Sequence, residues 1–126
     1  MVSFRQLLEI NINGGMYIHR SQMPQIDNHE SFIQFLTQKG YEVSLVDDVE
    51  LSSIKPTQHD IDLEKVAQND SEKPIFISSD NFILDGHHRY FHKKNFTDKY
   101  SIQAYQANTT INKLLKLAYD YLNDGI

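Results

Sequence analysis

The chain has 126 residues, enough for one domain, and its 40% apolar and 23% charged residues are typical of a globular protein rather than a disordered one. The absence of cysteine excludes disulfides, thiolate metal sites and thiol catalysis. A formal net charge of −5 argues against binding of duplex DNA by the whole surface, although a local basic site is compatible with it.

We expect a cytoplasmic protein with no membrane partner. No apolar run approaches the roughly 18 residues that a membrane span needs. The first segment, MVSFRQLLEI, lacks the long apolar stretch and the small-residue cleavage site of a secretory signal.

The first third of the sequence predicts two helices. Apolar residues at helical spacing predict one over residues 3–10, which ends at the sequence NGG. The segment SQMPQID that follows predicts an extended connector, because proline disfavours helix before it. Asp27 and Glu30 have capping-box spacing, which predicts a second helix over residues 28–38 that Gly40 closes.

Strands and short helices alternate through the middle of the chain. A strand is predicted over residues 41–51, followed by a loop around Pro56 and a short helix capped by Asp60 or Asp62. PIFISS predicts a buried strand, and DN is a turn signal that makes FILD its hairpin partner. A helix over residues 86–94 comes next.

The last part of the chain predicts a strand in SIQAYQA and a clear amphipathic helix in TTINKLLKLAYDYLND, with Thr110 as its cap. The whole pattern predicts a single α+β domain over residues 1–126. We divide it into a helical N-terminal extension (1–40), a core (41–107) and a C-terminal helix (108–126).

The segment ILDGHHRYFHKKN combines features of an anion-binding site. A helix that starts near Gly86 presents unpaired N–H groups and a partial positive charge, and glycine lets a ligand approach the backbone. Arg89 offers a forked, permanent cation, and His87 and His88 add donors that titrate near neutral pH. Together these residues predict a phosphate cradle.

Two other interpretations of this segment stay open. A histidine–arginine pair at a helix start is often only solvated surface. The weaker alternative is a zinc site formed by His87, His88 and His92. Adjacent histidines point in different directions, and no other residue completes a tetrahedral set of ligands.

ILDGHHRYFHKKN, preceded by PIFISSDNF, resembles the core motif of the ParB/sulfiredoxin superfamily, in which a strand, a hairpin and a glycine turn lead into a helix. The corresponding box is Gly-Cys-His-Arg in sulfiredoxins, Gly-x-Arg-Arg in ParB-type CTPases and close to Asp-Gly-His-x-Arg in ParB-like free-serine kinases. VELSSIKPTQHDIDLEKV resembles the first ParB box, and the combination is similar to small ParB-like proteins predicted from bacteriophage genomes. The resemblance covers residues 45–107. It implies a small mixed sheet with packed helices, to which this chain adds N-terminal helices and a C-terminal helix.

The chain also departs from these families. His87 stands where a sulfiredoxin has its catalytic cysteine, which excludes reduction of a sulfinic acid through a protein thiol. His88 stands where the ParB box has a second arginine, which weakens the expectation of a CTP clamp. The chain has no room for a helix-turn-helix domain, so DNA loading of the partition type is not expected.

The resemblance also implies that Lys55, Thr57 and Gln58 lie in a loop that faces the GHHR helix and contact phosphate or ribose. The alternative is a turn whose polar residues meet solvent. Asp85 has three possible roles, of which helix capping is the first expectation; the others are binding of Mg²⁺ beside a phosphate and general-base catalysis.

The leading functional expectation is a nucleotide-binding protein, for ATP, ADP or CTP with Mg²⁺, that catalyses phosphoryl transfer or nucleotide hydrolysis. Gly86 and the following N–H groups would hold the phosphates, and His88 and Arg89 would neutralise their charge. His87 would act as general acid/base or transient phosphoryl acceptor, with Asp85 as the metal ligand.

Two further functions remain open from the sequence. One is a ParB-like nuclease that cuts DNA or oligonucleotides. The other is a non-enzymatic phage protein that binds a host protein.

Overall fold

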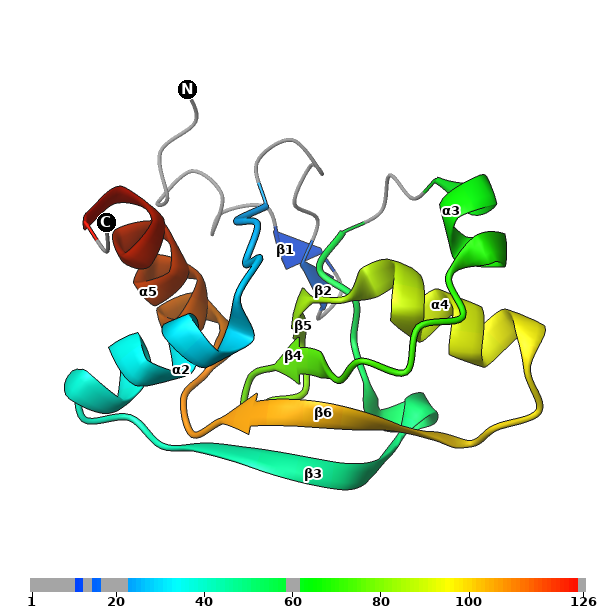
Figure 1. Cartoon of the computed structure of the whole chain (residues 1–126), viewed down its shortest axis with the longest axis horizontal. Helices are drawn as coiled ribbons and strands as arrows, with labels where there is room; N and C mark the ends of the chain where they lie inside the picture. Colours follow the sequence, from blue (N-terminus) through cyan, green and yellow to red (C-terminus); the bar gives the residue numbers. More distant parts are fainter. Residues whose placement is uncertain (1–10, 13–14, 17–22, 59–61, 125–126) are drawn as a thin grey trace.

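The computed structural model describes residues 11–12, 15–16, 23–58 and 62–124, and it shows an α+β fold (Figure 1). Its helices are α2 (His29–Gln38), α3 (Leu63–Gln68), α4 (His87–Phe96) and α5 (Ile111–Asp124), with a 3₁₀ turn, η2 (Leu51–Ser53). Its strands are β1 (Asn11–Ile12), β2 (Gly15–Met16), β3 (Val43–Glu50), β4 (Ile75–Ile77), β5 (Ile83–Asp85) and β6 (Ser101–Ala107).

The main sheet has four strands in the order β3-β6-β4-β5. β4 and β5 form an antiparallel hairpin, and α4 then carries the chain back so that β6 pairs with β4 in parallel. β6 also pairs with β3 in antiparallel fashion, which leaves β3 at the outer edge, at the bottom of Figure 1. The sheet is therefore mixed, and the connection through α4 places the start of that helix directly after β5.

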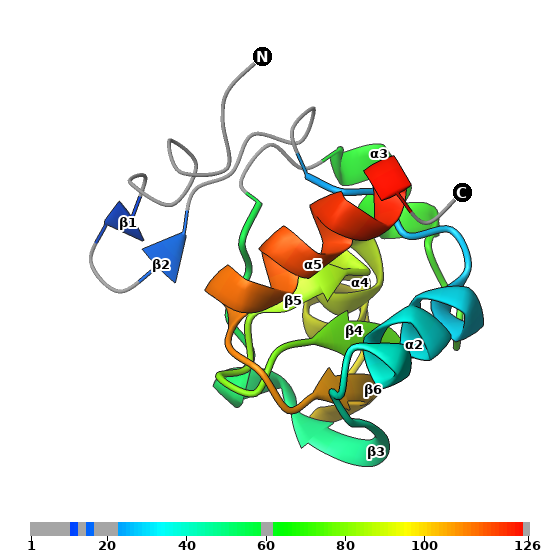
Figure 2. The same cartoon turned by 90° about the vertical axis from the view of Figure 1, so that its left-hand side faces the viewer.

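Apolar residues form two clusters on opposite faces of the sheet, because alternate residues of a strand point in opposite directions. One cluster joins α2 and α5 to the face that carries Phe76 and Leu84. The other packs Tyr90 of α4 against Ile75 and Ile77. Figures 1 and 2 show α2 and α5 beside each other, and in Figure 1 α4 lies on the other side of β4 and β5.

The expected helix over 28–38 is confirmed as α2, but its cap differs from the prediction. The side chain of Asn28, not that of Asp27, accepts a hydrogen bond from the backbone N–H of Ser31. Gly40 closes the helix with φ of +93°, as expected.

The strand SIQAYQA is β6 with the predicted bounds. The strand over 41–51 (β3), the helix over 86–94 (α4), the hairpin and the last helix also form, with shifted ends. Asp62 caps α3, as one of the two candidates. Thr110 takes the predicted N-cap position of α5, where its carbonyl accepts from the N–H of Leu114, and the N–H of Ile111 donates to the carboxylate of Asp80.

The N-terminal division of the chain needs correction. The predicted helix over 3–10 lies outside the described residues, as does Asp60, but β1 and β2 form an antiparallel pair, so the segment 1–40 is not purely helical. α2 contributes Phe32 and Leu36, both with no exposed surface, to the central core. No helix in the described residues is long and apolar enough to cross a membrane.

Candidate functional site

The site begins at the turn between β5 and α4, where Gly86 is the N-cap residue of the helix. Gly86 has φ of +102° and ψ of 26°, a left-handed conformation that strains other residues. A Cβ there would lie 2.6 Å from Cγ2 of Ile75 and 2.8 Å from Nη2 of Arg89. Glycine is therefore required by the turn and by packing against β4, because an added Cβ would collide with Ile75.

Asp85 does not cap α4, which corrects the first expectation for its role. The helix has no side-chain cap, and the carboxylate of Asp85 turns toward two other residues. Its Oδ2 lies 2.7 Å from Nε2 of His29 and 3.4 Å from Nη2 of Arg89. Asp85 thus connects His29 of α2 to Arg89 of α4.

Arg89 is held beside the pocket by the backbone of the protein as well as by Asp85. Its Nη2 donates to the carbonyl of Pro74 at 3.2 Å and to Asp85. Among the described residues nothing accepts a hydrogen bond from its buried Nε. Both described contacts of the guanidinium thus involve Nη2, and its Nε keeps a hydrogen-bonding capacity that no described residue uses.

His87 is only 5% exposed and connects α4 to the segment that contains Thr57. The backbone N–H of Thr57 donates to Nε2 of His87 at 3.1 Å, so this nitrogen carries a lone pair and a neutral ring has its proton on Nδ1. The Thr57 hydroxyl donates to the carbonyl of Ile83 at 2.7 Å. Because Nε2 already has a donor, we assign His87 and Thr57 to holding the loop against the helix.

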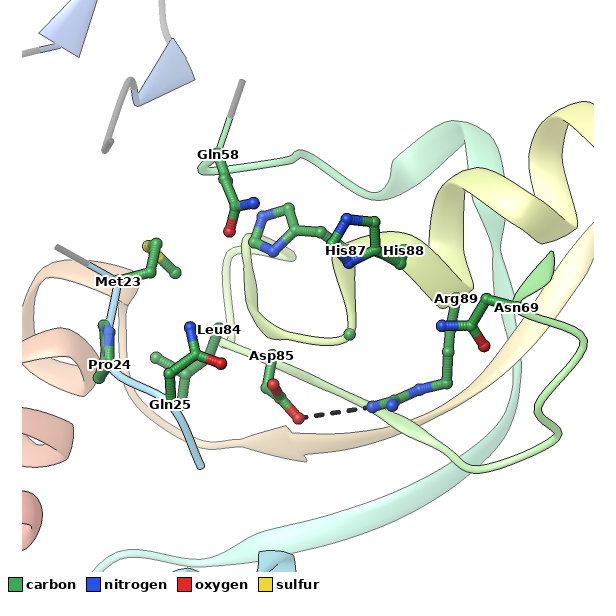
Figure 3. A pocket seen from close by; sticks show the side chains of 11 residues that line it. Met23, Pro24, Gln25, Gln58, Asn69, Leu84, Asp85, His87, His88 and Arg89 are labelled. Atoms are coloured by element: carbon green, nitrogen blue, oxygen red, sulfur yellow. Dashed lines mark hydrogen bonds and ion pairs between the residues drawn. The ribbon is translucent and has the colours of Figure 1, made fainter. Parts of the chain in front are cut away.

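A pocket of 130 Å³ lies at the start of α4 (Figure 3). Its described lining is mostly polar and combines the segment before α2, the loop that contains Gln58, the end of α3 and the turn from β5 into α4: Met23, Pro24, Gln25, Gln58, Asn69, Leu84, Asp85, Gly86, His87, His88 and Arg89. The dashed line in Figure 3 marks the ion pair between Asp85 and Arg89. The structure therefore brings together all the predicted residues of the GHHR box, with Gln58.

Two predicted site residues do not line the pocket: Thr57, which contacts His87, and Lys55. Its side chain is exposed, and its ammonium lies 5.0 Å from the centre of the Phe82 ring, a cation–π contact. Its backbone pairs with Phe82 at the edge of β5. The side chain of Lys55 therefore does not reach the pocket.

No family model matches the chain, and no curated protein and no solved structure matches it significantly. The resemblance to the ParB/sulfiredoxin superfamily therefore rests on the motifs alone.

The sequence did not predict His29, Asn69 or the lining contributed by Met23 and Pro24. His29 lies 56 residues before Asp85, and no local spacing relates the two. The capping pattern ahead of α2 marked the start of a helix, but not its position over the site.

Metal binding by protein groups alone has little support in the described residues, where no three His, Cys, Asp or Glu side chains come together. His92 is not directed toward His87, because its Nδ1 donates to the carbonyl of Val66 at 2.7 Å. Asp85 fits Mg²⁺ only as one carboxylate ligand. A single carboxylate is compatible with a Mg²⁺ ion held largely by phosphates and water. The charge of the ion would neutralise that of the phosphates.

Proposed function

We propose that the pocket binds the terminal phosphate of a nucleotide such as ATP or CTP and that the protein transfers or hydrolyses this phosphoryl group. The observation that carries the proposal is the meeting of the Arg89 guanidinium with the first turn of α4 in one polar pocket. A guanidinium and the N-terminus of a helix both favour anionic oxygens. A ParB/sulfiredoxin-like fold and a cytoplasmic location belong to the same proposal.

The size of the pocket determines which part of the nucleotide it would hold. Pockets for drug-sized ligands have roughly 300–1,000 Å³, and this one has 130 Å³. The base and ribose would therefore lie outside it, with the phosphate against Gly86, His88 and Arg89. The amide side chains of Gln58 and Asn69 would offer further donors.

Asp85 is suited to act as the general base. Both of its described contacts use Oδ2, while the residue lines the pocket, so Oδ1 can accept a proton there. Water or an alcohol would lose a proton to Oδ1 as its oxygen bonds to phosphorus. The bond from phosphorus to the bridging oxygen would break, with the electron pair leaving on the nucleoside diphosphate.

Arg89→Ala and Lys55→Ala form a matched pair of variants, since each removes one cation. Wild-type protein is titrated with ADP, ATP and CTP, with and without Mg²⁺, and the melting temperature is measured, because a ligand of the folded state raises stability. We expect a nucleotide-dependent increase that Arg89→Ala loses and Lys55→Ala keeps, since only Arg89 lines the pocket. A wild type that responds to no nucleotide contradicts the function, and equal responses in both variants contradict the site.

A second candidate function is the binding or cleavage of single-stranded nucleic acid, and the far end of α4 favours it. Tyr100, 87% exposed, lines a 570 Å³ groove together with Lys94 and Lys99, and Phe96, 56% exposed, stacks on His92 at the end of α4. Exposed aromatic rings beside lysines are a stacking platform for bases. Glu50 and Asp98 also line this groove, so two carboxylates balance the two lysines.

Labelled single strands and duplexes, followed by fluorescence anisotropy, test this candidate. Stacking contributes about 1–3 kcal/mol per base, so the double variant Phe96→Ala/Tyr100→Ala should weaken single-strand binding by tenfold or more. Incubation with Mg²⁺ or Mn²⁺ then reports cleavage. The absence of single-strand binding by the wild type would remove this candidate.

A further inference from the structure

We propose that His29, on the first turn of α2, is a positioning residue that fixes the carboxylate of Asp85 for catalysis. The inference rests on the proposed function, because it assigns a role in the chemistry of the same pocket. It adds a residue from a segment outside the GHHR motif, and it makes α2 part of the working site.

The contact between the two side chains is short and well supported. Nε2 of His29 lies 2.7 Å from Oδ2 of Asp85, in the range of a charge-assisted hydrogen bond. A carboxylate only accepts, so Nε2 carries the proton. The side chains of His29 and Asp85 are only 17% and 22% exposed, which limits competition from water.

Two aromatic rings hold the imidazole of His29. The centres of the Phe76 and Tyr105 rings lie 5.6 and 5.7 Å from that of His29, and both meet it edge to face. Phe76 is fully buried in β4, so the imidazole is anchored to the sheet as well as to α2. A ring held on two sides directs Nε2 toward one place.

His29 acts through Asp85, because His29 itself is not among the described residues of the pocket lining. Both His29 and Arg89 contact Oδ2, which leaves Oδ1 for the ligand. The Arg89 contact is the longer of the two, at 3.4 Å.

Arg89 is also the group that an incoming phosphate would attract. Bidentate contact with phosphate is the strongest use of a guanidinium, so phosphate and Asp85 compete for it. His29 is the partner that keeps Asp85 oriented when Arg89 turns to the phosphate. Its effect should therefore appear in turnover more than in nucleotide affinity.

The test uses four variants of the full chain. His29→Phe keeps a ring against Phe76 and Tyr105 but removes the donor, and His29→Gln places an amide N–H near the position of Nε2. His29→Asn is too short to reach it. The exposed neighbour supplies the control, Glu30→Gln.

Turnover of ATP and CTP with Mg²⁺ and the dissociation constant of the diphosphate are measured for each variant, with melting temperature as the measure of folding. A positioned base contributes roughly 10²–10⁴-fold to the rate. We therefore expect the kcat of His29→Phe to fall at least about tenfold. The dissociation constant of the nucleoside diphosphate should change less than about threefold. His29→Gln should recover most of the rate, and Glu30→Gln should match the wild type.

Each outcome supports or overturns the proposal. A wild type with neither turnover nor nucleotide binding refutes the proposed function, and the role of His29 with it. An active wild type whose rate His29→Phe leaves unchanged refutes only the role of His29. Equal losses of rate and affinity with no recovery in His29→Gln indicate a merely structural residue and also refute it. If His29→Phe does not fold, the rates of His29→Gln and His29→Asn decide, and equal rates overturn the proposal.

Discussion

Thr57 joins three parts of the site through one residue. Its N–H donates to His87, and its hydroxyl donates to the carbonyl of Ile83 in β5. The side chain has no exposed surface, so water cannot replace either bond. The resemblance implied that Thr57 contacts ligand, whereas Thr57 does not line the pocket and instead holds His87 and Ile83.

Thr57→Val should destabilise the fold by about 1–3 kcal/mol, because the buried carbonyl of Ile83 loses its donor. Thr97→Val is the matched control: its hydroxyl also donates to a backbone carbonyl, that of Lys93, but at an exposed position where water substitutes. Urea unfolding measures both. Similar losses in the two variants would contradict the structural role of Thr57.

At the level of single residues, the sequence supports prediction of the cluster but not of its contacts. Asp85, Gly86, His88 and Arg89 are consecutive or nearly so, hence one turn brings them together. The partner of Asp85 could not be predicted, because His29 reaches it only through the packing of α2 on the sheet.

Among the elements, α4 depends most on a single backbone conformation. The left-handed Gly86 lets the chain turn from β5 into the helix while lying close to Ile75. The same residue thus directs β5, Asp85 and the first turn of α4 toward one pocket.

Gly86→Ala should cost about 1–2 kcal/mol for the positive φ and a further 1–3 kcal/mol or so for the contact with Ile75. Gly40→Ala is the control: its φ is +93°, but a Cβ there meets nothing within 4 Å, so only the first cost applies. The difference between the two unfolding free energies measures the close packing. No difference would mean that β4 yields to the added methyl group.

Element types were easier to predict than their ends. Periodicity and turn residues located β3, the β4–β5 hairpin, α4 and α5, because these signals extend over many residues. Caps depend on one side chain. Asn28 rather than Asp27 caps α2, and Asp80, far away in sequence, supplies the acceptor for Ile111.

For the whole molecule, the sheet is the layer that both clusters share. Ile75, Phe76 and Ile77 of β4 are all fully buried and face the two clusters alternately. Loss of packing on one face therefore destabilises β4, and the cluster on the other face packs against the same strand.

Ile77→Ala and Leu114→Ala remove apolar contacts from opposite clusters, and each should cost about 2–5 kcal/mol. Because β4 belongs to both faces, we expect one cooperative transition in each variant, detected at the same urea concentration by far-ultraviolet circular dichroism and by tyrosine fluorescence. Two separate transitions in either variant would show that the faces unfold independently.

The α+β class followed from the order of predicted elements, but the architecture did not. Nothing local specifies that β6 lies between β3 and β4, since strand order is a property of long-range packing. For the same reason the boundary at residue 40 suggested an extension, whereas Phe32 and Leu36 of α2 lie in the core.

Within the described chain no strand pairs with the outer edge of β3, so the backbone N–H and C=O groups on that edge have no strand partner there. A bulge between Val46 and Val49 breaks the even spacing that a second molecule would need to add a strand. Asp47 and Asp48, both exposed, give two approaching copies like charges at that point. Neighbouring molecules should therefore repel one another edge to edge in dilute buffer, and concentrated salt, which screens that repulsion, is where self-association would first appear.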